Sequence, residues 1–212
     1  MVVRLSDDIS PFWFWEGGIP PNVCDQIINS IDDKHYAIGG VMEVKDSGRI
    51  SEDISEMNID KSIRKVYVQF TDIPWINSLM RGFILSANEN NFLYDLSMED
   101  RESCQISKYV GSINDSQYYN THYDWVPVRA ANAYTRKLSL SCQLTNPNHY
   151  EGGDLNLYLT NPSTTSPIKY TASKKQGTVI VFDSRIVHEV EPVTSGTRHS
   201  VVKWYHGDKP LR

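Results

Sequence analysis

The chain has 212 residues, 40% of them hydrophobic, and can therefore bury one sizeable core. Its net charge of −5 and isoelectric point near 5.7 argue against a surface that neutralises nucleic-acid phosphates or lies on an anionic membrane. Three widely spaced cysteines without a C-x-x-C pair indicate neither a disulfide framework nor a zinc knuckle, and they fit a reducing compartment. We expect a single domain over 1–212 in the cytoplasm, without a secretory leader or a membrane span.

The first half of the chain is predicted to supply the helices, mainly over 20–90. The aromatic segment 12–18 is predicted to be a first strand. In the next segment Asn22 is expected to cap an amphipathic helix, and a second helix is predicted within 71–91, where apolar residues recur three and four positions apart. The polar segment 39–58 between them is expected to be a long loop, interpreted either as a lid over a binding site or as a surface insertion.

After residue 100 the hydrophobic period changes to that of a β-strand. Apolar and polar residues alternate, and turn signals at 151–153, 161–167 and 194–196 separate the alternating segments. Short strands without helices between them favour a sandwich or barrel over a parallel sheet. The sequence thus predicts a mainly β fold with flanking helices, with its β-core mainly over 101–207.

Three of the six histidines are followed two positions later by an acidic residue, so this motif alone does not select a site. His149 runs into a double glycine, which indicates a turn, and His206 is interpreted as a solvated strand end. His122 and Asp124 differ from these. On a strand they would project from the same face and present two metal ligands side by side, with Tyr123 pointing away.

A third ligand and a permanent cation are predicted further along the chain. His188 precedes Arg198 by ten positions, with turn-like residues between them. A hairpin there would set the two side chains opposite each other on one face. Two histidines and one carboxylate without an evident fourth ligand form the facial triad of non-haem Fe(II) oxygenases. We therefore predict that His122, Asp124 and His188 bind a metal beside Arg198.

The order of these features resembles the prolyl-4-hydroxylase-like branch of the Fe(II)/2-oxoglutarate dioxygenases. Over about residues 101–207 the chain shows a tyrosine a dozen positions before His-x-Asp, an arginine-led strand, a Gly-Gly-acid-Leu turn, a distal histidine and a basic residue ten positions later. The resemblance implies a double-stranded β-helix, or jelly-roll, core with supporting N-terminal helices. It also implies Fe(II) and 2-oxoglutarate as cofactors, O2 as co-substrate and L-ascorbate as an accessory reductant.

The resemblance also implies a role for residues beside the triad. Arg198 is expected to bind the distal carboxylate of 2-oxoglutarate with its guanidinium, a geometry for which arginine is suited. The Tyr109 hydroxyl is expected to donate to the same carboxylate, with Ser200 on the face of Arg198. Ser139 and Ser141 line the polar face of their strand and are considered as supports for the site.

The expected reaction is hydroxylation of a substrate C–H bond with release of succinate and CO2, and the expected substrate is a peptidyl or protein proline. Another side chain or a small molecule stays open as the substrate. The run HSVVKW after Arg198 lacks the second arginine of the nucleic-acid demethylating branch, so no nucleic-acid partner and no membrane partner are expected. A metal-free jelly-roll binding module and a zinc hydrolase with the same ligands remain alternatives. The sequence does not indicate an oligomeric state.

Overall fold

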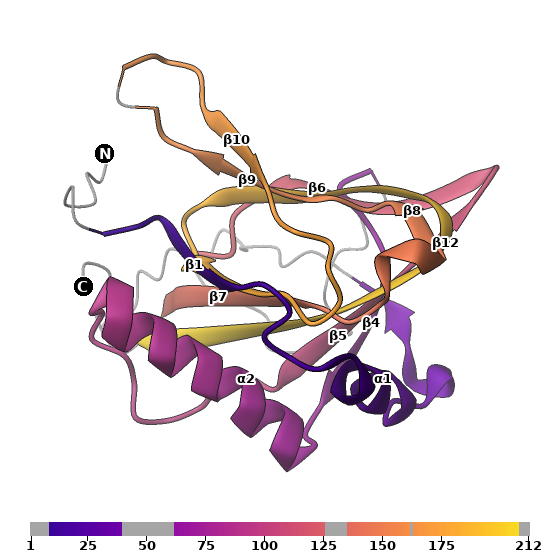
Figure 1. Ribbon diagram of the computed structural model, residues 1–212, viewed down its shortest axis with the longest axis horizontal. Helices are drawn as coiled ribbons and strands as arrows, with labels where there is room; N and C mark the ends of the chain where they lie inside the picture. The colour runs from indigo at the N-terminus through magenta and orange to yellow at the C-terminus, as the bar shows by residue number, and fades with distance from the viewer. Residues whose placement is uncertain (1–8, 40–61, 126–134, 162, 208–212) are drawn as a thin grey trace, which may run out of the picture.

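The structure is a computed structural model that describes residues 9–39, 62–125, 135–161 and 163–207 (Figure 1). Nearly all of the predicted loop 39–58 therefore lies outside the described residues. The described part is mainly antiparallel β-sheet with few helices, in a jelly-roll arrangement, as the sequence predicted. No described helix has both the length and the apolar character that crossing a bilayer requires.

Two α-helices are described, α1 (Pro21–Asn29) and α2 (Pro74–Ala87), and a π-helical turn at Asn88–Phe92 extends the second. The predicted cap at Asn22 is wrong, because α1 begins one residue earlier and Pro20 occupies the cap position without a side-chain hydrogen bond. A proline at the first helical position already has the helical φ and lacks the N–H that a cap would satisfy. Short 3₁₀ turns lie at Asp33–His35 and Pro147–His149.

The strands form two facing layers. The larger layer carries the helices on its outer side and contains, in spatial order, β1 (Phe12–Trp15), β11 (Val179–Asp183), β7 (Thr135–Gln143), the C-terminal half of β12 (Val187–Gly207), β5 (Cys104–Ser112), β4 (Tyr67–Thr71) and β2 (Ala37–Ile38). The smaller layer contains β3 (Arg64–Lys65), β6 (Asp115–His122), the N-terminal half of β12, β9 (Leu155–Leu159) and β10 (Ile168–Thr171), with β8 (Tyr150–Gly152) against the middle of β12.

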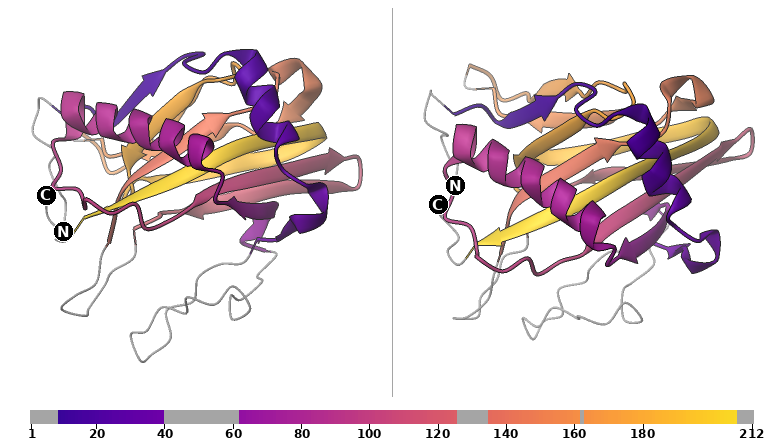
Figure 2. Two further views of the ribbon diagram at one scale, coloured as in Figure 1. Left: turned by 90° about the horizontal axis from the view of Figure 1, so that it is seen from below. Right: turned by 60° about the horizontal axis from the view of Figure 1, so that its bottom comes forward.

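The two faces of the larger layer differ in polarity, as strand alternation requires. Leu138, Leu140 and Cys142 of β7 pack in the core under α1 and α2, and Figure 2 shows both helices on that side of the sheet. Ser139 and Ser141 of the same strand point to the opposite side, between the layers. One face of the sheet is therefore core under the helices. The other combines the serines of β7 with a second hydrophobic cluster that includes Ile180 and Phe182 of β11.

Strand β12 belongs to both layers. His188 pairs with His122 in the smaller layer, while Val201 lies between β5 and β7 in the larger one. The hairpin expected between His188 and Arg198 is wrong, because the chain continues as one strand with register shifts in this region. Such bulges bend a strand without reversing it, so turn-forming residues such as Gly196, with φ of +74°, are accommodated there.

Candidate metal centre and cofactor site

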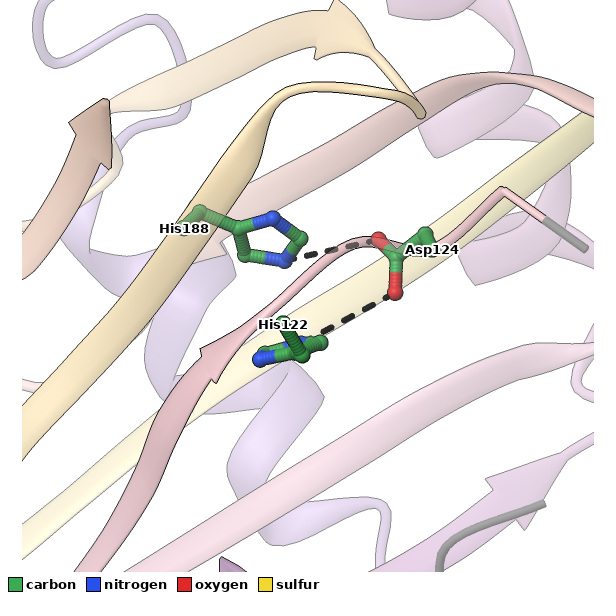
Figure 3. Close-up of side chains that lie close together, drawn as sticks. All are labelled: His122, Asp124 and His188. Carbon is green, nitrogen blue, oxygen red and sulfur yellow. Dashed lines mark ion pairs between the residues drawn. The ribbon is translucent and has the colours of Figure 1, made fainter. Parts of the chain in front are cut away.

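The predicted triad comes together at the end of β6. His122 is the last residue of that strand, Asp124 follows two positions later, and His188 is paired with His122 from β12. The Asp124 carboxylate lies 3.9 Å from Nε2 of His122 and 3.5 Å from Nε2 of His188 (Figure 3). The three ligand atoms lie within 4.8 Å of one another, which is compatible with a single metal ion. Tyr123 between them is 55% exposed and points away, as expected.

Both histidines are oriented by the backbone. Nδ1 of His122 donates to the carbonyl of Asn120 at 2.8 Å, and Nδ1 of His188 donates to the carbonyl of Ile186 at 2.9 Å. A hydrogen bond at Nδ1 fixes the tautomer and leaves the Nε2 lone pair available. Each imidazole therefore presents a ligand nitrogen toward Asp124.

The charge states also suit a cation. Burial opposes ionisation of Asp124, but the neighbouring His188 and His122 outweigh it and lower the Asp124 pKa to about 2. Burial and the nearby His188 lower the pKa of His122 to about 3. At neutral pH the carboxylate is ionised and His122 is neutral, and metal binding requires these forms.

Asp124 is held by polar groups of the larger layer. The Ser139 hydroxyl donates to Oδ2 of Asp124 at 2.8 Å and contacts the Ser184 hydroxyl at 2.9 Å. The Asp124 N–H donates to the Ser184 carbonyl at 2.9 Å. Ser139 therefore does reach the site, and Ser184 is a contact that the sequence analysis missed. Ser141 is buried further along the same face.

Aromatic rings flank the histidines. The Tyr119 ring stacks on His122 with centroids 3.5 Å apart, and Phe182 meets His188 edge-on at 4.8 Å. On a regular strand Tyr119 and His122, three positions apart, would face opposite sides. The register shift between β6 and β12 puts the two rings on the same side, and no sequence pattern predicts this shift.

Arg198 lies between the layers and is 1% exposed. Its Cα partner on β5 is Tyr109, and its guanidinium carbon lies 5.2 Å from the centroid of the Tyr109 ring. Nη1 donates to the Ser200 hydroxyl at 3.3 Å, whereas Nε and Nη2 are buried without a hydrogen-bond partner among the described residues. Buried donors are rarely left unpaired, so these two indicate an acceptor that binds here. A carboxylate matches a guanidinium with two open donors.

The predicted Gly-Gly turn provides space beside Arg198. Gly153 has φ of +66°, and a Cβ atom there would lie 2.9 Å from Cδ of Arg198. The buried Tyr150 hydroxyl also lacks a hydrogen-bond partner in the described part of the chain. The residues present thus fit an anionic ligand beside Arg198, and 2-oxoglutarate has the required carboxylate.

The two other His-x-acid motifs do not join the triad. His149 is exposed at the end of a 3₁₀ turn. The interpretation of His206 as a solvated strand end is wrong. Its Nε2 lies 2.8 Å from Glu102, and it is 8% exposed, because β12 continues beside β7 to Gly207 and Arg136 and Glu102 cover the strand end.

Fold and site together are a jelly roll with two histidines and one carboxylate close together, the ligand set of the facial triad found in non-haem Fe(II) oxygenases. Residues 104–206 match the model of the 2OG-Fe(II) oxygenase superfamily. Over this region the chain is similar to the 2OG-Fe(II) oxygenases. That similarity implies Fe(II), 2-oxoglutarate and O2 as the cofactors and co-substrate, and the triad fits that set.

Solved structures show the same fold. A Pseudomonas putida prolyl-4-hydroxylase has a TM-score of 0.65 at 16% identity, with 94% of each chain covered. A Trichoplax adhaerens prolyl hydroxylase, solved with a hypoxia inducible factor peptide fragment, has a TM-score of 0.66 at 17% identity, covering 93% of this chain and 84% of that one.

Curated relatives include PKHD-type hydroxylases. One from Crocosphaera subtropica is 27% identical over 63% of this chain, and one from Synechococcus sp. (strain CC9311) is 26% identical over 85%. The matched region spans 56% of the first relative and 71% of the second. The chain thus covers little more than half the length of the first relative.

Proposed function

We propose that this protein is an Fe(II)- and 2-oxoglutarate-dependent dioxygenase that hydroxylates a substrate C–H bond. The observation that carries this is the combination of two features: the His122, Asp124 and His188 cluster, and a buried Arg198 with two unpaired donors on the same strand as His188. A zinc hydrolase would use the cluster but would leave those donors without a partner. A metal-free binding module would use neither the ionised Asp124 nor the oriented imidazoles.

The chain's own residues bind and orient. Nε2 of His122, Nε2 of His188 and the Asp124 carboxylate would hold Fe(II), and a site with three protein ligands would leave coordination positions for 2-oxoglutarate and O2. Arg198 would bind the distal carboxylate through Nε and Nη2, with Tyr109 and Ser200 beside it. Bound together, the cofactors supply oxidation of a C–H bond to an alcohol, with one oxygen atom of O2 in that alcohol and the other in succinate, and with release of CO2.

The substrate that we propose is a peptidyl or protein proline. Two structural neighbours are prolyl hydroxylases by name, and one of them was solved with a peptide fragment. The names of the curated relatives indicate hydroxylases of the PKHD type. These similarities support a peptide substrate.

We also propose that residues 1–212 form a single domain, because β12 pairs with strands of both layers.

The test incubates the full chain with Fe(II), 2-oxoglutarate, O2 and a panel of proline-containing peptides. Mass spectrometry should find one added oxygen atom on a proline, with one succinate formed per hydroxylation. Matched peptides with alanine in place of proline should stay unchanged. Turnover of 2-oxoglutarate without any modified peptide would reject the proline substrate alone. Absence of both iron binding and 2-oxoglutarate turnover would reject the oxygenase.

A further inference from the structure

The turn between β11 and β12, residues Asp183–Ile186, contacts two of the three proposed iron ligands. The Ser184 carbonyl accepts the backbone N–H of Asp124 at 2.9 Å. The Ile186 carbonyl accepts Nδ1 of His188 at 2.9 Å. One four-residue turn thus orients ligands that come from different parts of the chain.

The Asp183 carboxylate holds this turn in shape. It is 3% exposed and accepts the backbone N–H and Nε of Arg185, both at 2.8 Å. Its second oxygen accepts the Tyr94 hydroxyl and Nη2 of Arg185. The Asp183 carbonyl also accepts the N–H of Ile186 at 2.9 Å, which closes the turn. A buried carboxylate with this number of donors is fully satisfied and rigid.

Tyr94 connects the turn to the helical side of the molecule. It lies 89 positions before Asp183 in the chain, just after the π-helical end of α2. The Asn88 side chain bonds both the N–H and the carbonyl of Tyr94, at 2.8 and 3.0 Å. Burial, with Asp183 nearby, raises the Tyr94 pKa, so its hydroxyl remains a donor at neutral pH.

His122 is held separately. Its Nδ1 bonds the Asn120 carbonyl and its ring stacks on Tyr119, and both partners belong to β6. Loss of the Asp183 bonds would therefore disturb Asp124 and His188 while leaving the anchor of His122 in place.

We propose that Asp183 is a positioning residue of the metal centre, which fixes Asp124 and His188 at binding distance through the Asp183–Ile186 turn. The inference rests on the proposed Fe(II) site, but not on the identity of the substrate. Groups that orient metal ligands typically change metal affinity by roughly 10- to 100-fold when removed.

The test measures Mn(II) binding to the metal-free full chain by electron paramagnetic resonance, and the visible spectrum of the Co(II) form as a report on ligand geometry. Asp183→Asn keeps the side-chain shape but turns one acceptor into a donor facing Arg185, and it should weaken Mn(II) binding by roughly 10- to 100-fold and alter the Co(II) spectrum. Asn77→Ala is the matched control. It removes hydrogen bonds to Thr71, Ile73 and Cys104 on the helix-facing side of the larger layer and should leave both signals unchanged.

Unchanged Mn(II) binding in a folded Asp183→Asn protein would overturn the proposal, and so would equal losses in Asp183→Asn and Asn77→Ala. If Asp183→Asn does not fold, Tyr94→Phe decides, because it removes one donor to Asp183 and keeps the ring. A weaker Mn(II) affinity in Tyr94→Phe supports the proposal, and an unchanged affinity rejects it. A wild-type chain that binds no Mn(II) would instead reject the proposed oxygenase itself.

Discussion

At the scale of single residues, the spacing of the ligands was predictable and their surroundings were not. The His-x-Asp motif and the distal histidine predicted that His122, Asp124 and His188 lie together, as they do, while metal binding by them and cofactor binding by Arg198 stay predictions. The contacts of Ser184 and Tyr119 were not predicted. Ser184 acts through its backbone carbonyl, and Tyr119 contacts His122 because of a register shift between β6 and β12. Neither kind of contact can be predicted from a pattern of residues in the sequence.

Loss of any triad residue should abolish turnover. His122→Ala, Asp124→Ala and His188→Ala each remove one of three ligands, so 2-oxoglutarate decarboxylation should fall to background, as measured by succinate release. His149→Ala is the control and should retain normal turnover, because that side chain is exposed outside the triad. A His188→Ala protein as active as the wild type would remove His188 from the site.

Arg198→Ala should weaken 2-oxoglutarate binding with little effect on the metal. Hydrogen bonds to charged groups contribute about 1.5–3 kcal/mol, which corresponds to a roughly 10- to 100-fold rise in Kd. Calorimetric titration of 2-oxoglutarate into the Mn(II) form measures this change, and a Mn(II) titration alone provides the control. Equal 2-oxoglutarate affinities would show that Arg198 does not bind this ligand.

At the scale of elements, hydrophobic period predicted both helices and most strands, but not how β12 runs. The residues between His188 and Arg198 have the composition of a turn, and turn composition is also what a bulged strand uses when it passes between layers. The difference is decided by pairing partners distant in the chain, such as β5 and β8, which local sequence does not contain.

A test at this scale compares two glycines. Gly153→Ala introduces a Cβ in the left-handed region and 2.9 Å from Cδ of Arg198. It should destabilise the protein by roughly 1–3 kcal/mol and weaken 2-oxoglutarate binding. Gly82→Ala in α2 meets no heavy atom within 4 Å and should stabilise by roughly 0.5–1 kcal/mol. Urea unfolding measures both, and a Gly153→Ala protein of wild-type stability and affinity would contradict the expected contact.

At the scale of the whole molecule, the strand pattern predicted a sandwich or barrel and the family resemblance implied the jelly roll, while neither predicted the buried ionic groups. Glu102, Arg136 and His206 form an enclosed cluster at a strand end that the sequence suggested was solvated. Charged residues are usually exposed, and the pairing of β12 with β7 is what brings His206 beside Glu102 and Arg136.

Lowering the pH should destabilise the metal-free protein at pH values that are still above the range in which carboxylates titrate. Burial, with Lys108 nearby, lowers the pKa of His199 to about 4, and His122 behaves in the same way. A depressed histidine pKa means that the unfolded chain binds the proton more tightly. Stability is therefore complete above the ordinary histidine pKa of about 6.5 and falls as pH decreases toward 4. Urea unfolding in a chelator, at neutral pH and at about pH 5, should show this loss.

The variant His199→Gln measures how much His199 contributes to the loss of stability at low pH. The variant lacks the titrating ring, so its unfolding free energy should fall less between neutral pH and about pH 5 than that of the wild type. An identical pH profile would mean that His199 does not contribute to acid lability.

The passage of β12 through both layers also sets the order in which the protein can assemble. Arg198 is paired with Tyr109, 89 positions earlier, and His188 with His122, 66 positions earlier. Contacts that close such long loops form late and slow the folding of β-rich chains. Strand β12 must therefore be synthesised and must pair with its neighbours before the proposed iron and 2-oxoglutarate sites exist, so a nascent or half-folded chain should bind neither.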